Sequence, residues 1–328
     1  MPDIMDFQEA LKETEGKDRT LLLGNGFSGG LGHFHYQSLL EQAEIPADSG
    51  ARKLFDRLGT ADFEYIIRAL EGASMVDEAY GRKDIADQIL ADAQMVRDAL
   101  VKAVHATHPK NREELQQHYN KALQFLTSFR SLFTLNYDLL LYWIVIEHRG
   151  RFADGFGLGE IKDGGAFRGP FTDDAHCDMF NLHGGLHLFQ DSIGDTWKAV
   201  NVGNGVIDVV ANAISTQGSL PLYVAEGTTE QKQARINSSV YLRHCYDKLR
   251  DNAAPVFIFG HSADDSDTHI YRAIFGSKVD QIYFGAFQAD QNEINRLRGQ
   301  ISRHQEAAGS KASIAFFRSE SVDLWTLP

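Results

Sequence analysis

Cysteine is scarce in this 328-residue sequence, and basic residues are outnumbered by acidic ones. The two cysteines, Cys177 and Cys245, are too few for a disulfide framework and cannot form a CxxC…CxxC zinc site. No apolar run approaches the roughly 18 residues that a membrane-spanning helix needs. The formal charge of −13 means that the chain lacks the positive field that attracts nucleic acid or anionic lipid.

The acidic segment at residues 1–6 lacks the basic n-region of a signal peptide. We therefore expect a cytoplasmic protein that binds neither nucleic acid nor membrane. The overall composition, with 43% hydrophobic and 23% charged residues, is typical of a globular protein. A chain of this length buries enough apolar surface to fold without disulfides or a structural metal.

Short apolar runs alternate with helical patterns along the chain. Strands are predicted at 19–23, 131–135, 179–183, 186–189, 220–224, 255–259, 281–284 and 313–317. Helices are predicted at 7–15, 28–40, 139–146, 238–250, 269–275 and 291–305. Ser28 would cap the second helix, and Gly184-Gly185 would form a turn between two short strands. This alternation predicts an α/β fold with a Rossmann-like parallel sheet flanked by helices.

Residues 51–129 show a different pattern. Apolar residues recur there at helical spacing, proline is almost absent, and acidic and basic residues alternate. This pattern predicts a helical insertion after the first βα unit, within a single domain that spans residues 1–328.

Glycine or short polar side chains follow three of the predicted strands. Gly-Asn-Gly-Phe-Ser at 24–28 follows the first, Asn-Tyr-Asp at 136–138 the second, and Gly-His-Ser at 260–262 a late one. Ligands of open parallel sheets bind beyond such strand ends, and a glycine loop before a helix suits a phosphate. The alternatives are a plain strand-to-helix turn and, for Asn136 and Asp138, a helix N-cap.

His183 ends another predicted strand and precedes two glycines. Its ordinary pKa suits proton transfer near neutrality, although the same position is compatible with a buried core histidine. His187 follows four residues later, but the intervening glycines disfavour the helix that would place both rings on one zinc ion. No metal site is predicted.

The segments at 24–28, 134–138, 182–184 and 260–262 occur in the order found in sirtuin-like NAD-binding domains, which the chain resembles over nearly its whole length. It is more similar to the prokaryotic zinc-less branch than to the protein deacetylases. The deacetylases carry a four-cysteine zinc ribbon where this chain has Cys245 alone. Many members of that branch hydrolyse NAD in antiphage defence.

The resemblance implies cleavage of the nicotinamide–ribose bond of NAD, with NAD as a substrate rather than a recycled cofactor, and without zinc. Asn136 would orient the ribose and the attacking water, His183 would be the general base, and Asp138 would hold a ribose hydroxyl or the carboxamide. The implied NAD-binding residues are Gly24, Asn25, Gly26, Phe27, Ser28, Gly260 and Ser262, with Asp264 or Asp267 less certain helpers. Glu64 and Lys232 lie in segments that also resemble this branch, but surface salt bridges would explain them equally well.

Relatives of this kind also imply a homo-oligomer and a partner protein, such as an ATPase, that controls activation. Two other functions stay open. One is a non-catalytic module that binds NAD or ADP-ribose. The other is an α/β-hydrolase esterase that uses Ser262 as nucleophile, although Asp264 occupies a position where the nucleophile elbow needs a small residue.

Overall fold

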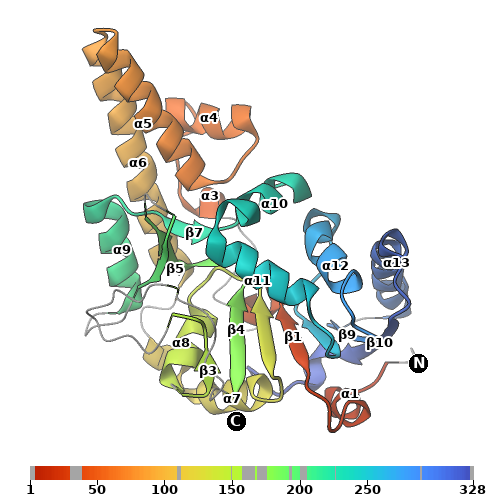
Figure 1. Cartoon of the computed structure of the whole chain (residues 1–328). Coiled ribbons are helices and arrows are strands. Elements are labelled where there is room, and N and C mark those ends of the chain that lie inside the picture. Colours follow the sequence, from red (N-terminus) through yellow and green to blue (C-terminus); the bar gives the residue numbers. More distant parts are fainter. Residues whose placement is uncertain are drawn as a thin grey trace.

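The computed structural model describes residues 4–29, 39–108, 112–148, 150–156, 167, 176–191, 194–199, 205–225, 227–288 and 290–325. Its centre is a seven-stranded sheet in which every pairing is parallel (Figure 1). The strands, in sheet order, are β10 (Ser313–Arg318), β9 (Gln281–Ala286), β8 (Val256–Phe259), β1 (Thr20–Leu23), β2 (Ser131–Thr134), β4 (Cys177–Asn181) and β3 (Phe152–Ala153). This confirms the predicted α/β, Rossmann-like class.

The sheet has its topological switch point at β1. The chain moves from β1 to β2 and β4 on one side, then returns to β8 on the other side. The four strands are in register, because Leu23 lies between Thr134 and Phe259, and Thr134 lies beside Asn181. Their carboxyl ends therefore form one edge, where an open parallel sheet binds its ligand.

Side chains of β1 alternate between two apolar layers. Leu21 and Leu23 pack in the layer that includes α1 (Phe7–Glu13), α7 (Tyr119–Leu126) and α8 (Leu140–Glu147). Leu22 packs in the layer that includes α11 (Val240–Arg250), α12 (Thr268–Phe275) and α13 (Gln291–Ala308). Helices thus cover both faces of the sheet, which explains why the sequences of the central strands are continuous apolar runs.

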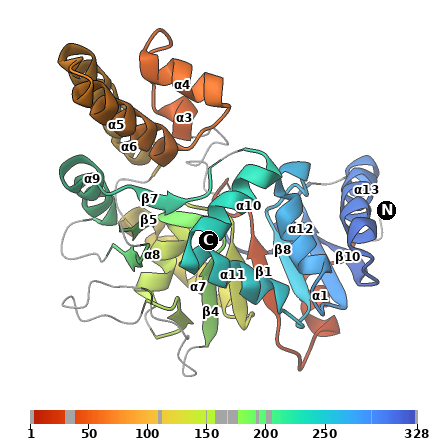
Figure 2. The same ribbon diagram turned by 45° about the horizontal axis from the view of Figure 1, so that its top comes forward.

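A group of helices follows the first strand and stands away from the sheet (Figures 1 and 2). It contains α3 (Leu39–Gln42), α4 (Gly50–Leu58), α5 (Phe63–Ala79) and α6 (Lys83–Thr107), and η1 (Arg112–His118) leads back to α7. Ser49 and Asp62 cap α4 and α5 by accepting hydrogen bonds from the backbone. None of the helices in the described ranges, α6 included, is long and apolar enough to cross a membrane.

A second, antiparallel sheet packs beside the first. Its strands are, in sheet order, β6 (Thr196–Lys198), β5 (Gly184–Gln190) and β7 (Pro221–Tyr223). In the sequence, β7 lies between α9 (Val206–Gln217) and α10 (Thr229–Ser238). The predicted turn at Gly184-Gly185 is wrong, because both glycines belong to β5 and the turn lies at 182–183. A Cβ at Gly184 would lie 2.0 Å from the carbonyl oxygen of Leu222, so close strand pairing explains this glycine.

The predicted helix at 28–40 is described only at its two ends. The first is α2 (Gly26–Gly29), the second is the start of α3, and residues 30–38 lie outside the described residues. Ser28 is inside α2, so the prediction that it caps a helix is wrong. Its hydroxyl is used elsewhere, as described below.

Candidate functional site

The loops after β1 and β8 interlock at the switch point. The N–H of Gly24 donates to the carbonyl of Phe259 (2.9 Å), and the N–H of Gly26 donates to that of Gly260 (2.8 Å). Gly260 has a φ of +71°, and a Cβ there would lie 2.5 Å from the backbone nitrogen of Phe27. The glycines are therefore needed for loop-to-loop packing, a role that the sequence did not reveal.

Ser28, Asn136 and Asp138 form a hydrogen-bonded triplet that joins the loop after β2 to α2. The hydroxyl of Ser28 donates to Oδ2 of Asp138 (2.6 Å) and accepts from Nδ2 of Asn136 (3.0 Å). The second oxygen of Asp138 accepts from the backbone N–H of Leu140 (2.9 Å) at the start of α8. Asp138 thus serves the α8 terminus and fixes Ser28, and both of its oxygens are engaged.

Asn136 is buried and its Oδ1 makes no hydrogen bond with the described residues. Its side-chain nitrogen is anchored by Ser28, and its backbone N–H donates to Oγ1 of Thr134 (3.0 Å). A buried acceptor without a partner is costly unless a water or ligand donor completes it. This oxygen is therefore a candidate ligand contact at the edge of the sheet.

His183 follows β4 at the position at which Asn136 follows β2, since Asn136 and His183 lie two residues beyond the paired Thr134 and Asn181. The carbonyl of His183 accepts from the N–H of Val224 (2.9 Å), which ties the turn to β7. Nε2 of His183 lies 3.0 Å from Nε2 of His269 on α12, and the two rings are stacked. Nδ1 of His183 makes no hydrogen bond with the described residues.

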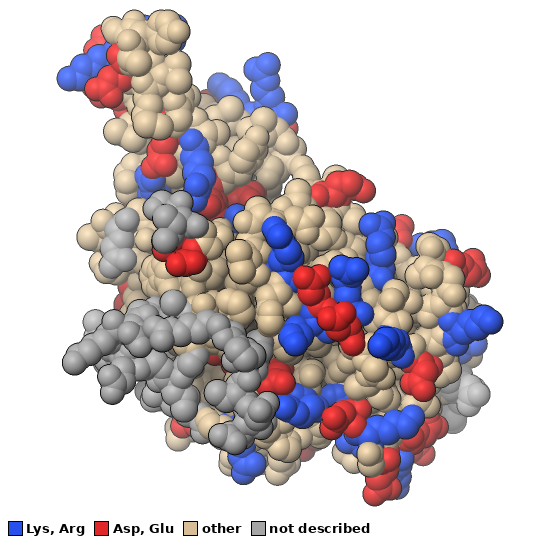
Figure 3. Space-filling model, viewed as in Figure 1, with Lys and Arg blue, Asp and Glu red and all other residues tan. Residues whose placement is uncertain are grey.

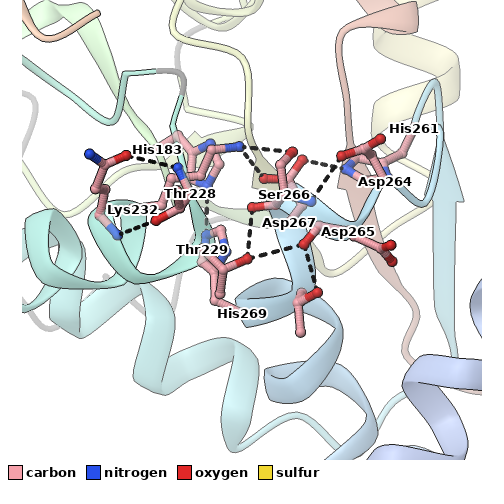
Figure 4. Close-up of polar contacts among 12 residues, drawn as sticks. His183, Thr228, Thr229, Lys232, His261, Asp264, Asp265, Ser266, Asp267 and His269 are labelled. Carbon is pink, nitrogen blue, oxygen red and sulfur yellow. Dashed lines mark hydrogen bonds and ion pairs between the residues drawn. The ribbon is translucent and has the colours of Figure 1, made fainter. Parts of the chain in front are cut away.

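Asp267 joins this pair of histidines to a second network (Figure 4). One carboxylate oxygen pairs with Lys232 (2.7 Å) and the other lies 3.1 Å from Nε2 of His261. Nδ1 of His261 accepts from the backbone N–H of Ala263 (2.9 Å), so the ring proton resides on Nε2 and is donated to Asp267. The hydroxyl of Tyr271 also donates to Nδ1 of His261 (2.8 Å).

Burial sets the protonation states of this cluster. It lowers the pKa of His183 well below its usual value and that of His269 to about 4, while the charge of Asp267 opposes both shifts. Burial alone would raise the pKa of Asp267, but the hydrogen bond from His261 and the nearby positive charges hold it well below the ordinary range. At neutral pH the two histidines are neutral and Asp267 is an anion.

His183, His269 and Asp267 place three potential metal ligands within 4.8 Å of one another. Two observations argue against a cation there. Both oxygens of Asp267 are already bonded, and the ammonium of Lys232 lies against the same carboxylate. The arrangement fits a charge network better than a metal centre.

Other residues proposed from the sequence serve local structure. Phe27 is buried against Trp325 with ring centroids 5.1 Å apart, and its carbonyl accepts from Nε1 of Trp325 (2.7 Å). The carbonyl of Asn25 accepts the N–H groups of Ser28 and Gly29 in α2.

In the loop after β8, Asp264 accepts from the N–H of Ser266 (2.8 Å) and caps η3 (Asp265–Asp267). Ser262 is exposed and makes no hydrogen bond with a histidine of the described residues.

Sequence reasoning missed His269 and gave no role to His261. His269 lies inside the amphipathic pattern of α12, where a fully buried histidine resembles any core residue. Lys232 and Glu64 are both buried rather than on the surface, and Glu64 pairs with Arg235 and with Arg68 (2.7 Å). Glu64 therefore connects α5 to α10, whereas Lys232 belongs to the site.

The family known as DUF4917, a domain of unknown function, matches residues 21–325. The chain belongs to this family. The match covers all of the strand-end loops described above, so this DUF4917 chain carries its candidate site inside the family domain. No curated protein matches the sequence.

Among solved structures, the DUF4917 chain is similar to a Sir2 homologue, a histidine-to-asparagine mutant in complex with ADP-ribose. The identity is 11%, the TM-score is 0.37, and the match covers 94% of this chain and 100% of the other. A likeness of this size carries no weight for the ligand of this chain. The function must be inferred from the site itself.

Proposed function

We propose that the chain is an NAD glycohydrolase that uses water to cleave NAD into nicotinamide and ADP-ribose. The observation that carries the proposal is the pairing of two incomplete polar groups at equivalent ends of adjacent strands. Asn136 offers a buried Oδ1 without a partner, and His183 offers Nδ1, which is likewise free of hydrogen bonds to the described residues. Both lie at the edge of the sheet next to the switch point, where nucleotides bind in open α/β sheets.

The order of the strand-end motifs supports placing NAD along this edge. We assign the pyrophosphate to the loop at 24–28, the adenosine side to Gly260 and Ser262, and the nicotinamide ribose to Asn136. Gly24 and Gly26 would shape this loop rather than donate to the pyrophosphate, because their N–H groups are bonded to the end of β8 and the loop after it. Both carboxylate oxygens of Asp138 accept hydrogen bonds within the protein, so we give this residue a positioning role. It accepts from the hydroxyl of Ser28, which in turn accepts from Asn136. We assign Asp267 to His183 rather than to the adenosine side, because their polar side-chain atoms lie within 4.8 Å of each other.

The chemistry needs a stabilised sugar cation and an oriented nucleophile. As the bond to nicotinamide breaks, positive charge develops on the ribose, and an aligned amide oxygen stabilises it while fixing a hydroxyl or the water. Asn136 is suited to this because Ser28 prevents the amide from rotating. The electron pair of the broken bond leaves with nicotinamide, and the water supplies the new hydroxyl of ADP-ribose.

His183 would take the proton that the water or a ribose hydroxyl releases. In this role Nδ1 faces the substrate as the acceptor, and Nε2–H donates to His269. The imidazolium that forms is stabilised by the negative charge of Asp267, which opposes the lowering of both histidine pKa values by burial. Because burial keeps His183 neutral, its base form is fully populated from neutral pH down to well below its usual pKa.

The test is release of nicotinamide from NAD by the purified full-length chain, followed by chromatography. His183→Ala should lower the rate by about 10²–10⁴-fold, the range lost when a general base is removed. Asn136→Ala should lower it by roughly 10²–10³-fold, as for an electrostatic donor or acceptor at the reacting centre.

His187→Leu is the matched control, because His187 is a buried histidine whose nitrogens make no hydrogen bonds with the described residues. It should retain the wild-type rate. Equal rates for wild type and His183→Ala would refute the role of His183.

NAD binding without turnover would instead favour a binding module, and labelling of Ser262 by a serine-reactive phosphonate would favour an esterase. The biological assignment follows from the resemblance: a cytoplasmic NAD-depleting effector of antiphage defence, held inactive until a partner protein such as an ATPase triggers it. Loss of cellular NAD on phage infection, abolished by His183→Ala, is the expected outcome.

A further inference from the structure

Exposed apolar side chains are concentrated on the projecting helices. Nine large apolar residues are exposed among the described residues, and seven of them lie between residues 58 and 90 on α4–α6 and the α5–α6 turn. In Figure 3 uncharged side chains predominate along the middle of this projection, and charged ones lie along its left edge and near its base. A contiguous exposed apolar patch on a globular protein usually marks an interaction surface.

One face of α5 carries a regular stripe. Tyr65, Ala69, Gly72, Val76 and Tyr80 recur at spacings of four and three residues, which places them along one side of a helix. The opposite side of α5, with Phe63, Ile66, Ile67, Leu70 and Ser74, is buried. Tyr65, Val76 and Tyr80 are 54%, 53% and 78% exposed. α5 is therefore apolar on its solvent side as well as on its core side.

Gly72 has no explanation within one copy of the chain. A Cβ at this position would meet no described atom within 4 Å, and the φ angle is not in the left-handed region. A glycine in the middle of a helix costs about 1 kcal/mol relative to alanine. Small residues at a helix surface allow two helices to approach closely, which gives Gly72, Ala69 and Ala73 a common purpose.

We propose that the α5 stripe binds the same stripe of a second copy, with the two α5 helices antiparallel about a two-fold axis between Gly72 and Ala73. This register places Tyr65 opposite the second copy's Tyr80, and Ala69 opposite its Val76. Read from either end, the stripe presents the same order of bulky, small and bulky side chains, as a two-fold interface requires.

The antiparallel arrangement favours a second copy over an unrelated occupant. The bulky residues stand at the ends of the stripe and the small ones at its centre, so a copy turned end to end matches it position by position. One pair of 17-residue helices buries less than the ~800 Å² per partner of a standard interface. We therefore expect a reversible dimer with a dissociation constant of about micromolar order.

Sedimentation of the full-length chain tests the dimer. Wild type at tens of micromolar should have twice the 36.6 kDa chain mass, and Val76→Glu should raise the dissociation constant by at least about tenfold because it places a charge in the apolar contact. Val240→Glu on α11 is the matched control, a valine outside the patch that is more exposed than Val76, and should leave the mass unchanged. A monomeric wild type, or a dimer that survives Val76→Glu, would overturn the proposal.

Cross-linking tests the register and does not depend on a folding-sensitive variant. Both native cysteines are buried, so a short bis-maleimide should react with introduced thiols only. Ala73→Cys should cross-link to itself near the two-fold axis. A mixture of Tyr65→Cys and Tyr80→Cys should cross-link, whereas Tyr65→Cys alone should not, because the two copies of residue 65 would be roughly 22 Å apart along the helix axis. Cross-linking of Tyr65→Cys alone would refute the antiparallel register.

Discussion

The edge of the sheet and the outer face of α5 break the usual rule of burial in opposite directions. At the edge of the sheet, Asn136, His183, Lys232 and His269 are polar and buried. On α5, apolar side chains face solvent. Buried polar groups are costly unless they are paired, whereas exposed apolar groups cost a monomer little. Substitution should therefore damage folding at the edge of the sheet and association at the outer face of α5.

The largest loss of stability is expected from Asp267→Asn. This change leaves the ammonium of Lys232 buried without its counter-ion, which costs about 3–5 kcal/mol when a buried pair is broken. Urea unfolding of the two proteins measures it. Asp247→Asn is the control, because its pair with Arg250 is exposed and contributes at most about 1 kcal/mol. Similar losses for both variants would contradict the buried network.

Gly260→Ala should be the next most harmful. The added Cβ would lie 2.5 Å from the backbone of Phe27 at a φ of +71°, so the loops after β1 and β8 cannot both keep their positions. We expect a loss of about 2–4 kcal/mol in the free energy of unfolding.

The matched substitution for Gly260→Ala is Gly299→Ala in α13, where nothing lies within 4 Å. It should raise stability by up to about 1 kcal/mol, since alanine is the better helix former. A neutral Gly260→Ala would show that the two loops are not interlocked.

Stability should also fall as the pH is lowered, because of the buried histidines. The pKa is lowered to about 3 for His187 and to about 4 for His269, both by burial. Between these values and the ordinary pKa near 6.5, the unfolded chain binds more protons than the folded one. Stability is therefore full above about pH 6.5 and declines as the pH falls toward 4.

His187→Leu should flatten this decline, as measured by Tm between pH 7 and 5. His187 packs on Tyr142, and its two nitrogens make no hydrogen bonds with the described residues, so leucine leaves no donor unsatisfied. A Tm profile as steep as that of wild type would assign the acid sensitivity to other groups.

The smallest effect on stability is expected at the α5 stripe. Val76→Glu should change the free energy of unfolding by less than about 0.5 kcal/mol when measured below the dissociation constant, because the side chain contacts solvent in one copy. Thermal unfolding at submicromolar concentration measures it. A large loss of stability would mean that Val76 supports the packing of α5 within one copy.

Local patterns predicted the sheet and part of the site. Buried strands such as Val256–Phe259 can be recognised in the sequence because they are short, continuous apolar runs that a glycine follows. The strand-end loops were found for the same reason, since parallel strands in register bring their carboxyl ends to one edge. The placement of Asn136 and His183 at this edge follows from that register alone.

The partners of those residues could not be predicted in the same way. His269 is 86 residues from His183, and its place in α12 looks like that of any core side chain. The separation of β5 from β4 into another sheet depends on pairing with β7 across the chain. Gly24 and Gly26 looked like ligand-facing residues, but the space they leave is taken by Gly260.

The contact between Trp325 and Phe27 joins segments 298 residues apart. During synthesis, the loop at 24–28 emerges early, whereas its neighbours from β8 and its anchor from Trp325 emerge only when nearly the whole chain has been made. A nascent chain shorter than about residue 269 holds only parts of the edge described here. The edge can therefore assemble only after most of the chain has been made.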